Sequence, residues 1–172
     1  AGLSAQQVPI LVATLGKSLG AAGAFVAGDR DLIEYLIQAA RPFVFSTAPP
    51  PAIAAAARHG LRIVRDQQWR RDHLFGLITR LQQGAKRLGL ALGPSTTPIQ
   101  PLILGDDARA LAVSEALLER GFLVSAIRPP TVPVGTARLR ITLSAAHDEQ
   151  QVDALLDALA DILAPTVQTS VA

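Results

Sequence analysis

One lysine stands in a setting that could support covalent chemistry. Lys17 follows an apolar run at positions 10–13 and has glycines close by on both sides. The pattern predicts a buried strand that ends in a tight turn, where a ligand can approach the backbone closely. The chain contains only one other lysine, Lys86. A desolvated lysine can lose its proton, which arginine cannot. The neutral amine could then form a Schiff base with a carbonyl compound.

Two other interpretations apply to the same residues. A lysine after a strand is commonly a solvated loop residue, and the local pattern leaves that alternative open. Gly16-Lys17-Ser18 also imitates the end of the phosphate-loop motif G-x-x-x-x-G-K-[ST]. That motif requires a glycine where Leu11 stands, so a phosphate loop of this type is excluded.

A second informative stretch lies between positions 128 and 140. Arg128 opens a loop stiffened by three prolines, and Arg138 and Arg140 follow on one face of the predicted next strand. Arginine binds carboxylates through two parallel hydrogen bonds, so these side chains could orient an acidic substrate. The alternative is that Arg138 and Arg140 form the solvated face of an ordinary strand.

The composition excludes several classes of function. The 172 residues are 49% hydrophobic, carry a formal net charge of +2 and include no cysteine. No block rich in Lys and Arg is present, which argues against a nucleic-acid partner. No apolar run approaches the ~18 residues of a membrane span. Neither His59 nor His73 has a second ligand at metal-binding spacing, so we expect no metal. A cytoplasmic protein fits these features.

The elements that must position these residues are predicted from periodicity and capping signals. We expect an α/β fold with a small sheet covered by helices on one side. The helix at 67–88 is expected to be disrupted around Gly76 and Gly84, and the polar linker 93–98 is the preferred boundary of a smaller C-terminal unit. The expected strands are 9–14, 23–27, 99–104, 122–127 and 137–144. Four further helices are expected: from Arg30 to about Ala40, from the prolines at 49–51 onward, from Asp106 or Asp107 to about Arg120, and from about Asp148 to Pro165.

The residues around Lys17 also resemble those of a known enzyme family. The segment Thr14-Leu15-Gly16-Lys17-Ser18-Leu19-Gly20-Ala21-Ala22-Gly23-Ala24-Phe25 resembles the cofactor-lysine segment of the α-oxoamine synthases. Members of this family are pyridoxal 5'-phosphate (PLP) enzymes of the aspartate-aminotransferase fold. The resemblance runs along nearly the whole chain but covers only the C-terminal part of the family's enzymes, roughly half. It implies the end of the PLP-binding large domain at residues 1–66 and a small α/β C-terminal domain, with its linking helix, at 67–172.

The resemblance assigns cofactor roles to four residues. Lys17 matches the lysine that forms the Schiff base with PLP and later moves protons. Thr14 matches a hydroxyl that binds the cofactor phosphate. Ser46 and Thr47 match a segment that contacts this phosphate across the interface of a homodimer. Taken locally, a helix cap or a turn explains Ser46 and Thr47 at least as well as a phosphate contact.

The segments Arg41-Pro42-Phe43-Val44-Phe45-Ser46-Thr47-Ala48 and Arg128-Pro129-Pro130-Thr131-Val132-Pro133 narrow the resemblance. They are similar to the members that condense L-alanine with pimeloyl-CoA, or pimeloyl-carrier protein, in biotin biosynthesis. Arg140 then matches the arginine that binds the amino-acid carboxylate, and Thr131 matches a substrate contact near the acyl chain, with Arg128 beside it.

One departure from the family and two rival interpretations accompany this resemblance. No histidine or acidic residue precedes Lys17, whereas the family places a ring-stacking histidine and a pyridine-pairing aspartate there. We therefore expect the 172 residues alone to be inactive or nearly so. The first rival is another α-oxoamine synthase, such as glycine C-acyltransferase, 5-aminolevulinate synthase or a sphingolipid-type palmitoyltransferase. The second is an inactive fragment that associates through exposed apolar surface.

Overall fold

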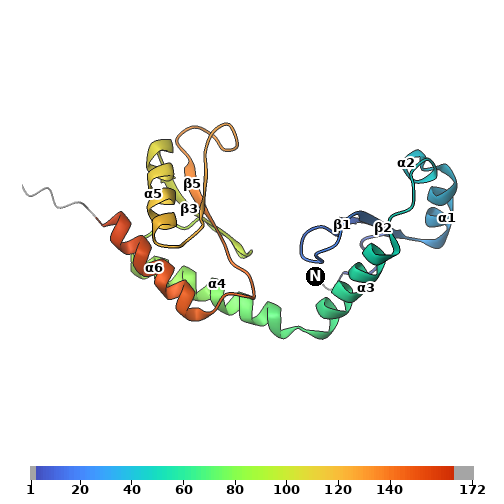
Figure 1. Cartoon of the computed structure of the whole chain (residues 1–172), viewed down its shortest axis with the longest axis horizontal. Coiled ribbons are helices and arrows are strands. Elements are labelled where there is room, and N and C mark those ends of the chain that lie inside the picture. The colour runs from blue at the N-terminus through green and yellow to red at the C-terminus, as the bar shows by residue number, and fades with distance from the viewer. Residues whose placement is uncertain (1–2, 165–172) are drawn as a thin grey trace, which may run out of the picture. The chain divides into compact units, whose positions relative to one another are not determined.

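The computed structural model describes residues 3–164, which form two compact units divided between Gln68 and Trp69 (Figure 1). The linker at 93–98 lies inside the second unit, so the boundary expected there is wrong. The reason is that the helix before the linker packs against the last helix of the second unit. The ends of the chain, including Pro165, lie outside the described residues.

The first unit is built on a hairpin of two antiparallel strands, β1 (Ile10–Thr14) and β2 (Ala24–Gly28), with Val12 opposite Val26. Helix α1 (Arg30–Ala39) follows and packs against β2. The Asp29 carboxylate accepts a hydrogen bond of 2.8 Å from the backbone amide of Asp31, as expected for the capping residue of this helix. A short helix, α2 (Arg41–Val44), and a longer one, α3 (Pro51–Asp66), complete the unit.

The first unit has almost no core of its own. Ala57 is the only buried residue among positions 3–68. The expectation that the first strand is buried is wrong: Ile10 is 54% exposed and Val12 is 67% exposed. The apolar run would suit burial on both faces, but the hairpin has only two strands and α1 lies against β2.

Within residues 69–164, the second unit is a three-stranded antiparallel sheet with three helices. Its sheet has the strand order β3–β5–β4, so the last strand in sequence lies in the middle. The elements are α4 (Trp69–Arg87), β3 (Ile99–Gly105), α5 (Asp107–Glu119), β4 (Ser125–Ile127), β5 (Ala137–Thr142) and α6 (Glu149–Leu163).

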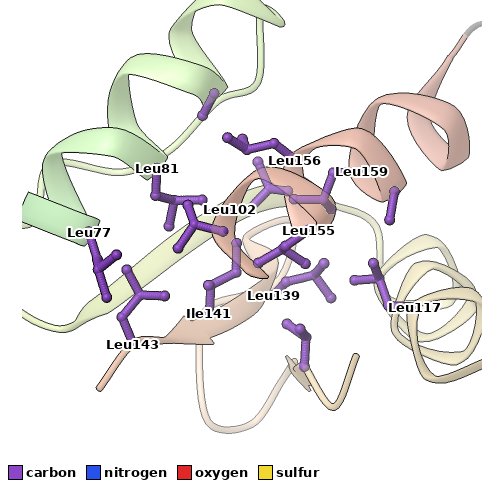
Figure 2. Packing of buried hydrophobic residues seen from close by; sticks show 14 of the residues in the cluster. Leu77, Leu81, Leu102, Leu117, Leu139, Ile141, Leu143, Leu155, Leu156 and Leu159 are labelled. Atoms are coloured by element: carbon purple, nitrogen blue, oxygen red, sulfur yellow. The ribbon is translucent and has the colours of Figure 1, made fainter. Parts of the chain in front are cut away.

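One face of this sheet carries the core. Leu139 and Ile141 of β5 are buried and meet side chains of all three helices, as Figure 2 shows. Arg138 and Arg140 alternate with them and lie on the opposite face, where Arg140 is exposed. The predicted half-buried strand, covered by helices on one side, is therefore confirmed.

Helix α4 is continuous, so the expected disruption around Gly76 and Gly84 is wrong. Gly84 is buried where α4 meets α6, and a Cβ atom built there would overlap the Cδ1 atom of Leu156. The missing side chain thus permits close approach of the two helices. At their exposed edge, the guanidinium of Arg80 donates to both oxygens of Asp153, at 2.7 and 2.6 Å, and to Glu149 at 2.7 Å.

A buried amide organises the linker at 93–98. Gln100 is fully buried, and its Nε2 atom donates to the backbone carbonyls of Ser95 and Thr97 at 3.1 and 2.6 Å. Its side-chain oxygen accepts from Gln82 of α4 at 3.0 Å. The linker is therefore tied to both β3 and α4. Among residues 3–164, no helix is long and apolar enough to cross a membrane.

Candidate functional site

The connection between β1 and β2, which we call the Lys17 turn (residues 15–23), is a structured loop. The amide of Leu15 donates to the carbonyl of Gly23 at 2.8 Å, and the amide of Ala21 donates to the carbonyl of Leu15 at 2.9 Å. The amide of Gly20 donates to the carbonyl of Lys17 at 3.0 Å. These bonds place Lys17 inside a closed backbone ring at the end of the hairpin.

Two glycines make this ring possible. Gly20 and Gly23 have φ angles of 62° and 93°, which L-residues with side chains rarely adopt. The predicted tight turn is thus confirmed, and access of a ligand to its backbone stays a prediction.

The side chains at this turn suit a phosphorylated aldehyde. Lys17 is exposed, and Thr14 is exposed at the last position of β1. Neither side chain forms a hydrogen bond or an ion pair with any of residues 3–164. An amine can bond an aldehyde covalently, and a hydroxyl can donate to a phosphate oxygen. The donor set therefore fits PLP.

Ser46 and Thr47 lie in the exposed segment between α2 and α3. The N-cap of α3 is Pro50, and no side chain caps that helix. The alternative of a helix cap is therefore wrong for these two residues. Within the described part of the chain their hydroxyl groups have no partner, which leaves them available to a ligand.

The second group of predicted residues lies in the proline-rich loop and in the strand that follows it. Arg128 and Thr131 are both exposed, and the amide of Thr131 donates to the carbonyl of Arg128 at 3.1 Å. Further along, the Thr136 hydroxyl donates to the carbonyl of Pro133 at 2.6 Å. The loop therefore has an internal frame, and the side chains of Arg128 and Thr131 remain free of it.

The structure distinguishes the two arginines of β5. Arg138 is half-buried, and its Nε atom donates to the carbonyl of Thr136 at 2.9 Å, so it holds the end of the loop. Arg140 is exposed and has no acceptor among residues 3–164. It lies between Pro101 of β3 and Ser125 of β4 in the sheet register. Arg140 is thus the arginine of this pair that can receive a carboxylate.

The predicted residues fall into two sets. Thr14 and Lys17 share one hairpin of the first unit, whereas Arg128, Thr131 and Arg140 belong to the second unit. The sequence did not single out Ser125, which lies beside Arg140 and carries a hydroxyl, because strand pairing is not visible in a single sequence. In the described chain, no group of three or more His, Cys, Asp or Glu side chains could hold a metal ion.

Comparisons with known proteins agree on the kind of fold. The profile of the family described as aminotransferase class I and II matches residues 1–159. The chain is 59% identical over 160 residues to an 8-amino-7-oxononanoate synthase of Pseudomonas fluorescens, a match that covers 93% of this chain and 41% of the relative. The chain therefore spans about two fifths of the length of the curated relatives it matches.

Solved structures give the same result. The 8-amino-7-oxononanoate synthase of Francisella tularensis is similar with a TM-score of 0.80 and 30% identity, over 92% of this chain and 47% of that one. A structure described as SPT with PLP internal aldimine has a TM-score of 0.83 and 30% identity, over 91% of this chain and 40% of that one. These neighbours are PLP-dependent α/β enzymes, and the present fold is a partial version of theirs.

Proposed function

We propose that this chain, which belongs to the class I and II aminotransferase family, is the C-terminal part of an 8-amino-7-oxononanoate synthase. The reaction is the decarboxylative condensation of L-alanine with pimeloyl-CoA, or pimeloyl-carrier protein, in biotin biosynthesis. The observation that carries this proposal is the 59% identity to the Pseudomonas fluorescens relative of that name, along 93% of this chain. We further infer a homodimer in the cytoplasm.

The first unit would hold the cofactor. PLP supplies an aldehyde for covalent attachment and a conjugated ring that stores the electrons of a carbanion. The Nζ atom of Lys17 would hold that aldehyde covalently, and the same amine would accept the proton from the substrate α-carbon. The Thr14 hydroxyl would donate to the cofactor phosphate. Ser46 and Thr47 would donate to the phosphate in the neighbouring subunit of the dimer.

The second unit would hold the substrates. The guanidinium of Arg140 donates two hydrogen bonds to the carboxylate of L-alanine and so orients the α-carbon. The Thr131 hydroxyl and the Arg128 side chain contact the acyl donor. Among residues 3–164 the side chains of Arg128 and Thr131 have no hydrogen-bond partner, and their loop has its own hydrogen-bonded frame. Both features support this assignment.

A serine palmitoyltransferase activity is the second candidate. A solved structure described as SPT is as similar to this chain as the Francisella tularensis enzyme, at 30% identity. Both activities use the same cofactor chemistry and differ in the amino acid and the acyl chain. Substrate preference therefore separates them.

The cofactor assignment is tested on the chain itself. PLP is added, the adduct is reduced with borohydride, and the modified peptide is located by mass. We expect a pyridoxyl adduct on Lys17, with Lys86 as the internal reference because it is the only other lysine. The variant Lys17→Ala should lose the adduct without a change at Lys86. Equal labelling of both lysines would contradict a specific cofactor site in this chain.

The substrate assignment requires a complete enzyme. We would replace the matching segment of the Pseudomonas fluorescens relative with this chain, since the two are 59% identical. The hybrid should form product from L-alanine and pimeloyl-CoA, and Lys17→Ala should abolish turnover. A preference for serine with palmitoyl-CoA would support the second candidate, and a preference for glycine would contradict both.

A further inference from the structure

A glycine in the first unit lies directly beneath the Lys17 turn. Gly60 is half-buried in the interior of α3. A Cβ atom built there would lie 2.9 Å from the carbonyl oxygen of Leu19, 3.4 Å from its Cδ2 atom and 3.5 Å from its Cα atom. Side-chain carbon atoms essentially never lie so close to a backbone oxygen. The backbone of Leu19 can therefore rest on α3 only because residue 60 has no side chain.

Local preference does not explain this glycine. It interrupts a helix that contains the strong helix formers Ala54, Ala55, Ala56 and Ala57, and glycine is the poorest helix former after proline. No positive φ angle is required at position 60. What the position supplies is close approach of a loop backbone, which a glycine permits and an alanine obstructs.

The contact reaches Lys17 through the backbone ring of the turn. Leu19 is two residues after Lys17, and it lies between the hydrogen bonds that Gly20 and Ala21 donate back to Lys17 and Leu15. A displacement of the Leu19 carbonyl would move these two amides. The position of the lysine backbone therefore depends on the surface of α3.

We propose that Gly60 is a positioning residue that seats the Lys17 turn on α3 and so fixes the backbone from which the lysine amine extends. This inference rests on the proposed function, because the contact between Gly60 and the backbone of Leu19 matters for catalysis only if Lys17 binds the cofactor. The contact itself is a property of the fold and can be measured without cofactor.

The experiment compares Gly60→Ala with Gly76→Ala in the full chain. Gly76 is also a helical glycine, but a Cβ atom built there has no described atom within 4 Å apart from the adjoining backbone of α4, so it controls for the change in helix preference. Rapid-quench hydrogen exchange with peptide mass analysis would follow the amides of residues 15–23 and of α3. Borohydride trapping with PLP would then compare labelling of Lys17 with labelling of Lys86.

We expect Gly60→Ala to accelerate exchange in the Lys17 turn by about tenfold or more, as overpacking against a backbone atom requires. Protection of α3 should stay the same or rise, since alanine favours helix. Labelling of Lys17 should fall relative to Lys86, and Gly76→Ala should change neither measurement at the turn.

Three results would overturn the inference. The amides of the Lys17 turn could lack protection from exchange in the unmodified chain, or their exchange could be unchanged in Gly60→Ala. Exchange could also accelerate equally throughout the first unit, including α3. A different result would overturn only the proposed function. In that result, exchange in the Lys17 turn accelerates in Gly60→Ala, but Lys17 of the unmodified chain does not react with PLP in preference to Lys86. The positioning role of Gly60 is then upheld, and the cofactor assignment fails.

Discussion

The close approach between two helices in the second unit predicts how two glycines of the same helix differ. Gly84 faces Leu156 of α6, and a Cβ atom at position 84 would overlap Cδ1 and lie 3.2 Å from Cγ of that leucine. At Gly76, two turns earlier in α4, a Cβ atom would have no described atom within 4 Å apart from the adjoining backbone of the helix. We predict that Gly84→Ala destabilises the second unit relative to Gly76→Ala.

The magnitude follows from two opposing effects. Replacing glycine by alanine in a helix interior stabilises by about 1 kcal/mol. At position 84 the new methyl group forces Leu156 out of its packing, and overpacking of a core costs about 1–3 kcal/mol. Gly76→Ala has the gain alone. The two variants should therefore differ by about 1–3 kcal/mol, or by at least about 4 °C in Tm for a unit of this size.

The assay is thermal unfolding followed by far-ultraviolet circular dichroism, with hydrogen exchange of α4 and α6 peptides to assign the transition to the second unit. Leu156→Ala provides the matched control, because it removes the atoms that the new methyl group meets. In that background Gly84→Ala should cost less than it does alone, as a double-mutant cycle would show. Equal stability of Gly84→Ala and Gly76→Ala would refute the packing argument.

Three further predictions concern polar residues of the second unit. The hydrogen bonds from Arg80 hold the pKa of the Asp153 carboxyl below its usual range. The pair therefore stabilises the fold at pH values above the pKa of unfolded aspartate, and this stabilisation is lost as the pH falls through the lowered folded-state pKa. Asp153→Asn should therefore flatten the acid side of a plot of Tm against pH, and an unchanged acid side would contradict a role for the pair. Gln100→Leu should lower the free energy of unfolding, measured with urea, by about 1–3 kcal/mol, because two linker carbonyls lose their buried donor; a neutral result would mean that water replaces it. In the hybrid enzyme, Arg140→Ala should raise the KM for L-alanine by about 10- to 100-fold, because hydrogen bonds to charged groups contribute about 1.5–3 kcal/mol. Arg138→Ala should raise that KM less, because the Arg138 side chain already donates to the carbonyl of Thr136. A larger effect of Arg138→Ala would assign the carboxylate to Arg138.

Much of the second unit follows from local signals in the sequence. Asp106 and Asp148 cap α5 and α6 through hydrogen bonds of 2.8 Å to the amides of Arg109 and Gln151. The alternation of apolar and polar residues along β5 predicts its buried and open faces. These features depend on neighbours within a few residues, and a single sequence contains that information.

Features that depend on the path of a loop backbone could not be predicted in the same way. The strand expected from Phe122 is reduced to Ser125–Ile127, because Phe122 turns back to donate to the carbonyl of Leu117 and Val124 enters the core. The sequence alone does not distinguish Arg138 from Arg140, because both fall on the same face of the alternating pattern of β5. Only the fold shows that the guanidinium of Arg138 donates to the carbonyl of Thr136, whereas Arg140 has no acceptor among residues 3–164.

The glycines discussed above also differ in whether their role can be predicted from the sequence. Those that shape the Lys17 turn, Gly20 and Gly23, are visible as turn signals because their effect is local. Gly60 and Gly84 carry no such signal: in a helical stretch a glycine indicates a weak point, and the disruption expected at Gly84 is wrong. In both helices the missing side chain instead admits a neighbour, a loop backbone at Gly60 and a leucine at Gly84. Gly60 and Gly84 therefore mark close contacts, whereas Gly76 marks none, and at Gly60 the contact leads to Lys17.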